Sequence, residues 1–464
     1  MLRSKEQAQG ALVERLRQLV PPDALLTSPE DLACYAYDGT WYEYLPDVVV
    51  TPNTTEQVAA ILKLANAERI PVVPRGAGSG LAGGSIPIEG GIVLSLARMN
   101  RILEIDTVNT VAVVQPGVLT AELQAAVERL GLFYPPDPAS LRQSTLGGNV
   151  AMSAGGPRCL KYGTTKDYVL GLEVVLANGE VLRTGGKAIK NVTGYNLCQL
   201  FTGSEGTLGV ITEITLRLLP LPRARRTLMA IFPRLEDASR LVTEVLGAGI
   251  LPATMELMDS TAIHCVEEYL HMGLPLDVEA ILVIEVDGDE AVVDREIDAV
   301  DGLCRQAGAS EVRRATTAEE AELLWQARRA VSGAMGRMRP NKLGEDIAVP
   351  RSAIVPMVRR IREIATRYHL PIVTFGHIGD GNLHPNILFD KRDAEEVERV
   401  HQAAGAILAA AVELGGTLSG EHGIGLAKRD YLAIDLHPQA IDVMKRIKKA
   451  LDPNGILNPG KIFP

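Results

Sequence analysis

Two histidines carry the clearest chemical signal in this 464-residue chain. His377 and His384 flank an Asp380-Gly381 pair that separates two strand-like runs, PIVTF and NILF. Asp-Gly at such a place favours a two-residue hairpin turn, which would put His377 opposite His384 with Cβ atoms about 4.5–5.5 Å apart. Imidazoles so placed can share a divalent ion at about 2.0–2.1 Å per nitrogen. The alternative is a surface pair that binds nothing, because a convincing metal site needs three or more ligands.

A third ligand and a candidate base are adjacent in the segment SGEHGIG. Neighbouring side chains of an extended segment point to opposite sides, so Glu421 would reach an ion while His422 faces another part of the same cavity. A neutral imidazole has a pKa suited to taking a proton from a substrate near neutral pH. The alternative for His422 is a loop histidine that only caps backbone groups.

Several cations gather in WQARRAVSGAMGRMRPNKLGED, and an acidic substrate would need one of them. Arginine is suited to a bidentate grip on a carboxylate. Ser332 lies one helical turn after Arg328 on the same face, and Lys342 is a second cation. Asn386, two residues after the second histidine, should point the same way as that histidine. The alternative is that Arg328 and Arg329 form a solvated helix face.

Glycine accounts for 44 residues, and 24 of them precede residue 210, mostly in clusters. Glycine permits positive φ and close backbone approach, so these clusters indicate loops that converge on one extended ligand, a phosphate-bearing cofactor. The run 78–83 matches the dinucleotide fingerprint G-x-G-x-x-G, but Pro87, Gly90 and Gly91 follow it, so no helix can begin there. What remains is a glycine loop, with Arg75 beside it, whose N–H groups can hold a pyrophosphate. The alternative is a merely tight loop.

Composition narrows the class of protein. With 22% charged and 46% hydrophobic residues, the chain is typical of a globular protein with a large core. A net charge of −10 and only 4% aromatic residues argue against nucleic-acid binding and against a stacking platform. Five scattered cysteines indicate neither a disulfide framework nor a thiolate zinc site, and they fit a reducing compartment. No signal sequence or long apolar run is present, so we expect a cytoplasmic protein without a membrane span.

The first half of the chain alternates strand and helix patterns. Strand-like runs occur at DVVVTP, at 70–74, at GIVLSL and at TVAVVQP. A helix is expected over 29–37, another follows the T-x-x-Q capping box that begins at Thr54, and a third covers 119–130. These elements would lead into and out of the glycine loops.

A break at LRLLPLPRARR separates this half from the next, where strands such as ILVIEV and IVTFGHI alternate with long helices over 236–247 and 393–414. The last stretch becomes glycine-rich and loop-like again. We therefore predict an α+β fold in three parts, which are a first domain over 1–220, a second over 221–415, and a segment 416–464 that returns to the first.

Five motifs in unbroken order resemble the flavin-binding domain of the vanillyl-alcohol oxidase and p-cresol methylhydroxylase family. They are PRGAGSGLAGG (74–84), PPDPAS (135–140), STLGGNVAMSAGG (144–156), KYG (161–163) and GSEGTLGVIT (203–212). The resemblance runs from about residue 40 to the C-terminus and is greatest to the branch of glycolate oxidase large subunits and D-lactate dehydrogenases. It implies a two-part FAD-binding domain and an α+β substrate (cap) domain with an antiparallel sheet.

The resemblance implies FAD as the cofactor. Covalent members carry a flavin-linked histidine in the first glycine loop, where this chain has Ser79, so non-covalent FAD is expected. The residues that match the family's cofactor contacts are Pro74, Arg75, Gly76, Ala77, Gly78, Ser79, Gly80, Leu81, Pro136, Asp137, Thr145, Gly148, Asn149, Ala154, Gly155, Gly156, Tyr162, Gly163, Glu205, Gly206, Val210, Ile211 and Asn458.

The resemblance also assigns roles to the polar residues. In D-2-hydroxyacid dehydrogenases of this branch, the H-x-G-D-G-N-x-H and G-E-H-G motifs bind a divalent metal (Zn, Mn or Fe), which here implies the ligands His377, His384 and Glu421. The W-x-x-R motif makes Arg328 the carboxylate clamp, and the implied substrate contacts are Arg328, Ser332, Lys342, Asn386 and His422. The implied reaction oxidises a small D-2-hydroxy acid to the 2-oxo acid, with hydride passing to flavin N5 and His422 as the base.

Two alternatives stay open from the sequence. A metal-dependent hydrolase could use the three metal ligands with an activated water, but it would leave the glycine loops unexplained. An FAD-bearing electron-transfer subunit could work only inside a complex, as glycolate oxidase large subunits do. The expected electron acceptor is a quinone, an electron-transfer flavoprotein, a cytochrome or an iron-sulfur partner subunit. A homodimer and peripheral membrane attachment through a partner are further options.

Overall fold

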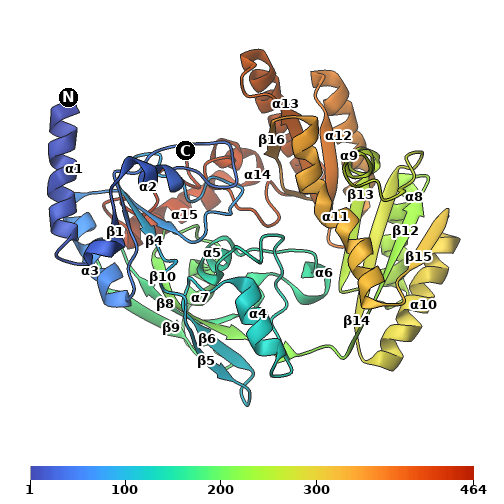
Figure 1. The fold of residues 1–464 in the computed structure, drawn as a ribbon, viewed down its shortest axis with the longest axis horizontal. Helices are drawn as coiled ribbons and strands as arrows, with labels where there is room; N and C mark the ends of the chain where they lie inside the picture. The colour runs from blue at the N-terminus through green and yellow to red at the C-terminus, as the bar shows by residue number, and fades with distance from the viewer. Residues whose placement is uncertain (1) are drawn as a thin grey trace. The chain divides into compact units, whose positions relative to one another are not determined.

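A computed structural model describes residues 2–464 and divides them into two compact units (Figure 1). Unit 1 consists of the chain up to Ala154, of Thr164–Leu221 and of Glu421–Pro464. Unit 2 consists of Gly155–Gly163 and Pro222–Gly420. The units divide at 221/222 and 420/421. The short excursion 155–163 into unit 2 differs from the expectation of one continuous first domain.

A small sheet with parallel inner strands opens unit 1, in the order β1-β2-β4-β3. The inner strands are fully buried apolar runs, as parallel strands covered on both faces usually are. Helix α3 packs its apolar face into the same core, and its N-cap Thr54 accepts a hydrogen bond from the Gln57 N–H. The bounds are α1 (Leu2–Leu16), β1 (Leu25–Leu26), α2 (Pro29–Cys34), β2 (Val48–Val50), α3 (Thr55–Glu68), β3 (Val72–Arg75) and β4 (Ile92–Ser95).

The glycine loop connects β3 to β4 without any helix, as the sequence predicts. A second sheet of unit 1 is antiparallel throughout, in the order β5-β6-β10-β8-β9, and β7 pairs with β11 apart from it. Its strands are β5 (Ile102–Asp106), β6 (Val111–Val114), β8 (Val169–Val175), β9 (Val181–Gly185) and β10 (Val210–Arg217), with β7 (Leu132–Phe133) and β11 (Leu219–Pro220). The remaining helices of unit 1 are α4 (Thr120–Glu128), α5 (Leu146–Met152), α7 (Leu197–Phe201), α14 (Leu432–Asp435) and α15 (Pro438–Leu451).

Unit 2 is built on one antiparallel sheet in the order β15-β12-β14-β13-β18-β19-β16, and β17 also pairs with β19. The strands are β12 (Ala224–Phe232), β13 (Thr254–Asp259), β14 (Ala280–Gly288), β15 (Glu311–Arg314), β16 (Asn341–Gly344), β17 (Ile347–Ala348), β18 (Ile372–His377) and β19 (Asn382–Phe389). This arrangement confirms the expected antiparallel α+β domain.

Helices cover both faces of the unit 2 sheet (Figure 1). Helices α9 and α11 share a hydrophobic core with alternate residues of β12 and β14, among them Met229, Ile231, Ile281 and Val283. A second group of helices packs on the other face of the same strands. The bounds are α6 (Cys159–Tyr162), α8 (Leu235–Gly247), α9 (Ser260–Leu270), α10 (Glu290–Gln306), α11 (Ala318–Met338), α12 (Ile354–Tyr368) and α13 (Ala394–Glu413).

The expected helices form with small shifts at their ends. Those expected over 119–130, 236–247 and 393–414 appear as α4, α8 and α13, while the helix expected over 29–37 ends at Cys34. Within residues 2–464, no helix combines the length and the apolar character that crossing a bilayer requires.

Candidate active site

The two histidines lie at the β18–β19 hairpin of unit 2, and both are buried. The expected register is wrong. His377 pairs with Asn382 and Phe375 pairs with His384, so the turn spans 378–381 instead of Asp380-Gly381 alone. The N–H of Gly381 donates to the His377 carbonyl across this wider turn. Because the register moves by two residues, both histidines stay on one face of the sheet.

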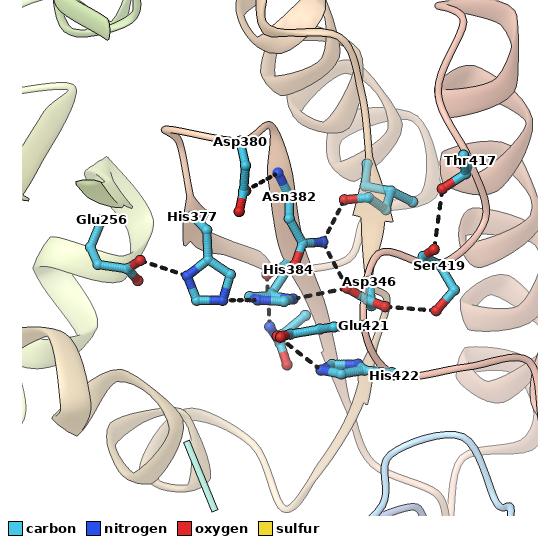
Figure 2. A network of polar contacts seen from close by, with 12 residues as sticks. Glu256, Asp346, His377, Asp380, Asn382, His384, Thr417, Ser419, Glu421 and His422 are labelled. Atoms are coloured by element: carbon cyan, nitrogen blue, oxygen red, sulfur yellow. Dashed lines mark hydrogen bonds and ion pairs between the residues drawn. The ribbon is translucent and has the colours of Figure 1, made fainter. Parts of the chain in front are cut away.

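The two rings nevertheless meet, as Figure 2 shows, with His377 Nε2 3.3 Å from His384 Nε2. Two nitrogens at about 2.05 Å from one ion, at a tetrahedral angle, are about 3.3 Å apart. The other ring nitrogen of each histidine faces a carboxylate. Glu256 Oε1 lies 2.5 Å from His377 Nδ1, and Asp346 Oδ1 lies 3.6 Å from His384 Nδ1. This donor set fits a divalent cation, because carboxylates behind metal-bound histidines orient the rings.

Glu256 also contacts the predicted carboxylate clamp. Its side chain is fully buried, and Oε2 lies 2.8 Å from an Nη of Arg328. The Arg328 guanidinium stands over the Phe375 ring, 4.5 Å from its centroid. Burial raises the pKa of the Glu256 carboxyl, but the neighbouring His377 ring and the Arg328 guanidinium outweigh burial and hold the pKa below its ordinary value. Glu256 is therefore an anion between the histidine pair and the arginine.

Asp346 anchors the other side of the histidine pair. Its Oδ1 accepts 2.7 Å from Asn382 Nδ2 and its Oδ2 accepts 2.7 Å from Ser419 Oγ (Figure 2). The Gly420 N–H donates to the Asp346 carbonyl oxygen. A Cβ on Gly420 would lie 2.4 Å from Asn382 Nδ2, so only glycine fits this approach. The chain leaves unit 2 directly after this contact.

Glu421 and His422 are the first residues of unit 1 after that crossing. His422 Nε2 lies 3.9 Å from Glu421 Oε1 (Figure 2). The expectation that these side chains point to opposite sides is therefore wrong. The segment bends here instead of running extended, so the alternation of side chains along a strand does not apply.

The second cation and the serine predicted for the substrate come together in unit 2. Lys342 Nζ on β16 donates 2.7 Å to Ser332 Oγ on α11. Burial lowers the pKa of Lys342. Asn386 is buried on β19, donates 2.8 Å to the His384 carbonyl, and lies opposite Gly344 in the ladder. Arg328, Ser332 and Lys342 thus belong to adjoining elements.

The first glycine loop in unit 1 is packed closely against the segment 144–149. A Cβ on Gly76 would lie 2.3 Å from Thr145 Oγ1, so the two chain segments can approach only because residue 76 is glycine. Among the described residues, the backbone N–H groups of residues 77–82 donate to no backbone carbonyl. A row of such donors fits a pyrophosphate. Arg75 instead turns toward Ser85 and the Tyr35 ring, which accounts for its burial.

Other predicted cofactor residues of unit 1 lie near this loop. A Cβ on Gly206 would contact Pro74, and Asn458 Nδ2 donates to the carbonyls of Gly84 and Glu205, each at 2.7 Å. The Glu205 carboxylate accepts from the N–H groups of Ile424 and Gly425. Of the rest, the following also belong to unit 1: Pro136, Asp137, Gly148, Asn149, Ala154, Val210 and Ile211.

Four predicted cofactor residues belong to unit 2 instead, namely Gly155, Gly156, Tyr162 and Gly163. The Tyr162 hydroxyl donates 2.8 Å to Asp287 Oδ2, and Lys161 Nζ lies 2.6 Å from Asp287 Oδ1. Burial, followed by the charge of Asp287, raises the pKa of Tyr162. This segment is therefore fastened to β14 through one buried aspartate.

Comparison with known proteins assigns the fold to a family. Residues 46–185 match the model "FAD binding domain", and residues 221–462 match the model "FAD linked oxidases, C-terminal domain". The chain belongs to the FAD-linked oxidases. As an FAD-linked oxidase it is an oxidoreductase whose cofactor is FAD.

Curated relatives of this FAD-linked oxidase cover nearly its whole length. It is 47% identical to glycolate oxidase subunit GlcD of Bacillus subtilis over 97% of this chain and 96% of the relative. It is 41% identical to GlcD of Escherichia coli K12, over 99% and 94% of the two chains. It is 40% identical to a D-lactate dehydrogenase of Archaeoglobus fulgidus, over 89% and 91%.

Solved structures confirm the fold class. Substrate-bound p-cresol methylhydroxylase aligns with a TM-score of 0.81 at 20% identity, over 98% of this chain and 97% of that chain. The 4-ethylphenol oxidase of Gulosibacter chungangensis gives a TM-score of 0.81 at 23% identity, over 98% of each chain. The oxidase therefore has the two-domain flavoprotein fold that the sequence motifs imply.

Sequence reasoning missed the two carboxylates behind the histidines. Glu256 could have been found from the sequence, because a glutamate in the middle of the largely apolar run TMELMD is unusual. Asp346 follows Glu345 in LGED, directly after the cation-rich segment, and its burial is not evident from that context.

Proposed function

We propose that this FAD-linked oxidase converts a small D-2-hydroxy acid, such as D-lactate or glycolate, to the 2-oxo acid. The observation that carries the proposal lies in unit 2, where His377 faces His384 and shares the carboxylate of Glu256 with Arg328. An arginine suits the acid group of the substrate. The names of the relatives, glycolate oxidase subunit and D-lactate dehydrogenase, support the same substrate class.

The anionic end of the substrate is assigned to the cations of unit 2. Arg328 grips the carboxylate, and Lys342, held by Ser332, supplies a second positive charge. Asn386 offers a polar side chain on the strand that carries His384. These fixed groups would orient the C2 hydrogen and the hydroxyl of the acid before reaction.

The hydroxyl end is assigned to the metal ligands and the base. His377 and His384 would hold the divalent ion, Zn, Mn or Fe, together with Glu421. Glu421 directly follows Gly420, whose N–H donates to the Asp346 carbonyl oxygen. His422 would take the hydroxyl proton at an imidazole nitrogen. When bound, FAD supplies the two-electron acceptor at N5 and the ion supplies a Lewis acid for the hydroxyl.

FAD is proposed to bind without a covalent link, since Ser79 occupies the loop position of the covalent members' histidine. The N–H groups of 77–82 would hold its pyrophosphate. Membership in the FAD-linked oxidases removes the metal-dependent hydrolase alternative, because hydrolysis has no use for a flavin.

A second candidate is supported by one name. The relatives from B. subtilis and E. coli are each called a subunit, so this chain could require a partner to pass electrons onward. The acceptor would then be an iron-sulfur partner, and otherwise a quinone, a cytochrome or an electron-transfer flavoprotein. Turnover of the isolated chain with an artificial dye separates the candidates, because a strictly dependent subunit would give none.

The decisive experiment for the reaction is an anaerobic visible spectrum. The purified protein should show a flavin band that bleaches on addition of D-lactate or glycolate and persists with L-lactate. Bleaching by the L-enantiomer alone would contradict the stereochemical assignment. A flavin band that no 2-hydroxy acid bleaches would contradict the substrate class.

A further inference from the structure

Glu256 is a buried carboxylate that the proposed reaction does not use directly. It lies on β13 between Met255 and Leu257, and its side chain has no exposed surface. Burying a charge costs free energy, and an apolar side chain of similar volume usually serves a core as well or better. The position therefore calls for a reason beyond packing.

The ladder between β13 and β18 places Glu256 directly opposite His377. At 2.5 Å from Nδ1, the carboxylate can only accept, so the Nδ1 proton of His377 points at Glu256. That hydrogen bond leaves the lone pair on Nε2, the nitrogen that faces His384. Glu256 thus selects the ring tautomer and the ring orientation that a metal ligand needs.

The second oxygen of the same carboxylate holds Arg328. One Nη of the guanidinium is engaged at 2.8 Å, and the Phe375 ring lies under its plane. The Arg328 Nε is buried and has no acceptor within the described residues. A guanidinium that is held by one Nη and still has a buried Nε donor without an acceptor can bind an anionic ligand.

We propose that Glu256 is a positioning residue that couples the two ends of the substrate site, by orienting His377 for the divalent ion and Arg328 for the substrate carboxylate. The proposal rests on the metal and substrate assignments of the proposed function. A carboxylate that only neutralised Arg328 would affect substrate binding alone. A carboxylate that only oriented His377 would affect metal binding alone.

The test compares Glu256→Gln with a matched control, Glu285→Gln. Glu285 is also buried in the same sheet, on β14, but it accepts from Trp325 Nε1 and Thr227 Oγ1 and contacts neither histidine. Zn²⁺ and Mn²⁺ affinity of the chelator-treated, FAD-loaded chain is measured by calorimetry, which needs no turnover. KM for D-lactate is measured separately at saturating metal.

We expect Glu256→Gln to weaken metal affinity about 10- to 100-fold and to raise KM about tenfold or more, as the loss of one charge-assisted contact would. Glu285→Gln should leave both within twofold. A change in only one of the two quantities, or in neither, would overturn the coupling. If Glu256→Gln does not fold, Glu256→Asp is measured instead, since its shorter side chain keeps the charge but cannot reach both partners.

Metal affinity and flavin bleaching of the parent protein show whether a failed test overturns the role of Glu256 or the proposed function. A parent that binds metal tightly, paired with a Glu256→Gln variant that binds it equally well, overturns only the role of Glu256. A parent that binds neither ion overturns the metal assignment and the role of Glu256 together, while bleaching of its flavin by D-lactate would still support the reaction.

Discussion

Lys342 Nζ donates a 2.7 Å hydrogen bond to Ser332 Oγ and thereby ties strand β16 to helix α11, one turn after Arg328. The ammonium is partly withdrawn from solvent, and burial lowers its pKa. Burial is the sole cause of this shift, and no carboxylate among the described side chains is paired with Lys342. The ammonium of Lys342 is therefore a positive charge that an anionic substrate can pair with.

Replacing this lysine tests that role. Lys342→Met should raise KM for D-lactate about 10- to 100-fold and change kcat little, because a charge-assisted contact contributes about 1.5–3 kcal/mol. Steady-state kinetics with an artificial dye measure both constants. The exposed Lys391→Met serves as the control and should behave as the parent does. An unchanged KM in Lys342→Met would refute the assignment.

The pH dependence of binding follows from the same lysine. Since its pKa is lowered, Lys342 loses its charge at a lower pH than an ordinary lysine does, so KM should rise as the solution becomes alkaline. Lys342→Arg should move this rise to higher pH, because an arginine stays charged. A KM profile in the arginine variant that coincides with that of the parent would show that another group titrates.

His422 is predicted to be the base. His422→Gln should reduce kcat about 10²- to 10⁴-fold, the usual contribution of a positioned general base, while the flavin spectrum stays unchanged. Rapid-mixing measurement of flavin reduction gives the rate of the chemical step directly. His437→Gln, at an exposed position before α15, provides the comparison. Reduction within a few-fold of the parent rate would exclude His422 as the base.

Gly80 offers a test of the proposed pyrophosphate loop. A Cβ there would meet no protein atom within 4 Å, and its φ is not positive, so Gly80→Ala should change the stability of the apoprotein by less than about 0.5 kcal/mol. If the cofactor lies against the loop, the added methyl should weaken FAD affinity at least tenfold. Fluorescence titration of the apoprotein with FAD measures this, with Gly302→Ala in α10 as the reference.

Asp259 should make stability depend on pH. Burial raises its pKa to about 6, from 3.8, although it accepts from the Ala262 N–H at the start of α9. Between these values the folded state keeps a proton that the unfolded state has released, so stability falls as pH rises through about 6. Asn caps a helix nearly as well as Asp and cannot titrate.

Asp259→Asn should therefore gain about 1–3 kcal/mol relative to the parent between pH 4 and pH 7. Urea unfolding at both pH values gives the difference, with the exposed Asp277→Asn for comparison. A stability difference between variant and parent that stays the same at both pH values would show that Asp259 is not the responsible group.

The sequence predicts the hairpin at His377 and His384, but not its register. Asp-Gly indicates where the chain turns, whereas the length of the turn depends on tertiary contacts. A Cβ on Gly379 would lie 2.4 Å from a Leu160 side-chain atom, and one on Gly381 would lie 2.0 Å from the Val349 carbonyl. Those neighbours are 219 and 32 residues away in the chain, and no local pattern reveals them.

Which carboxylates face the histidines cannot be predicted from the sequence for a similar reason. Glu256 lies 121 residues before His377, and Asp346 lies 36 residues before Asn382. Helix periodicity, capping residues and glycine loops are local signals, so they locate α3, α8 and the β3–β4 loop well. A buried ion pair is set by strand order, which periodicity does not encode.

The short segment Gly155–Gly163 limits where the chain can be cut into separate fragments. Its Lys161 and Tyr162 are held by Asp287, yet it lies between two stretches of unit 1. A fragment that ends at Leu221 would carry this piece without its aspartate, and one that begins at Pro222 would leave Asp287 without both partners. A single cut at 221/222 therefore separates Asp287 from Lys161 and Tyr162, so neither fragment keeps all the contacts of its own unit.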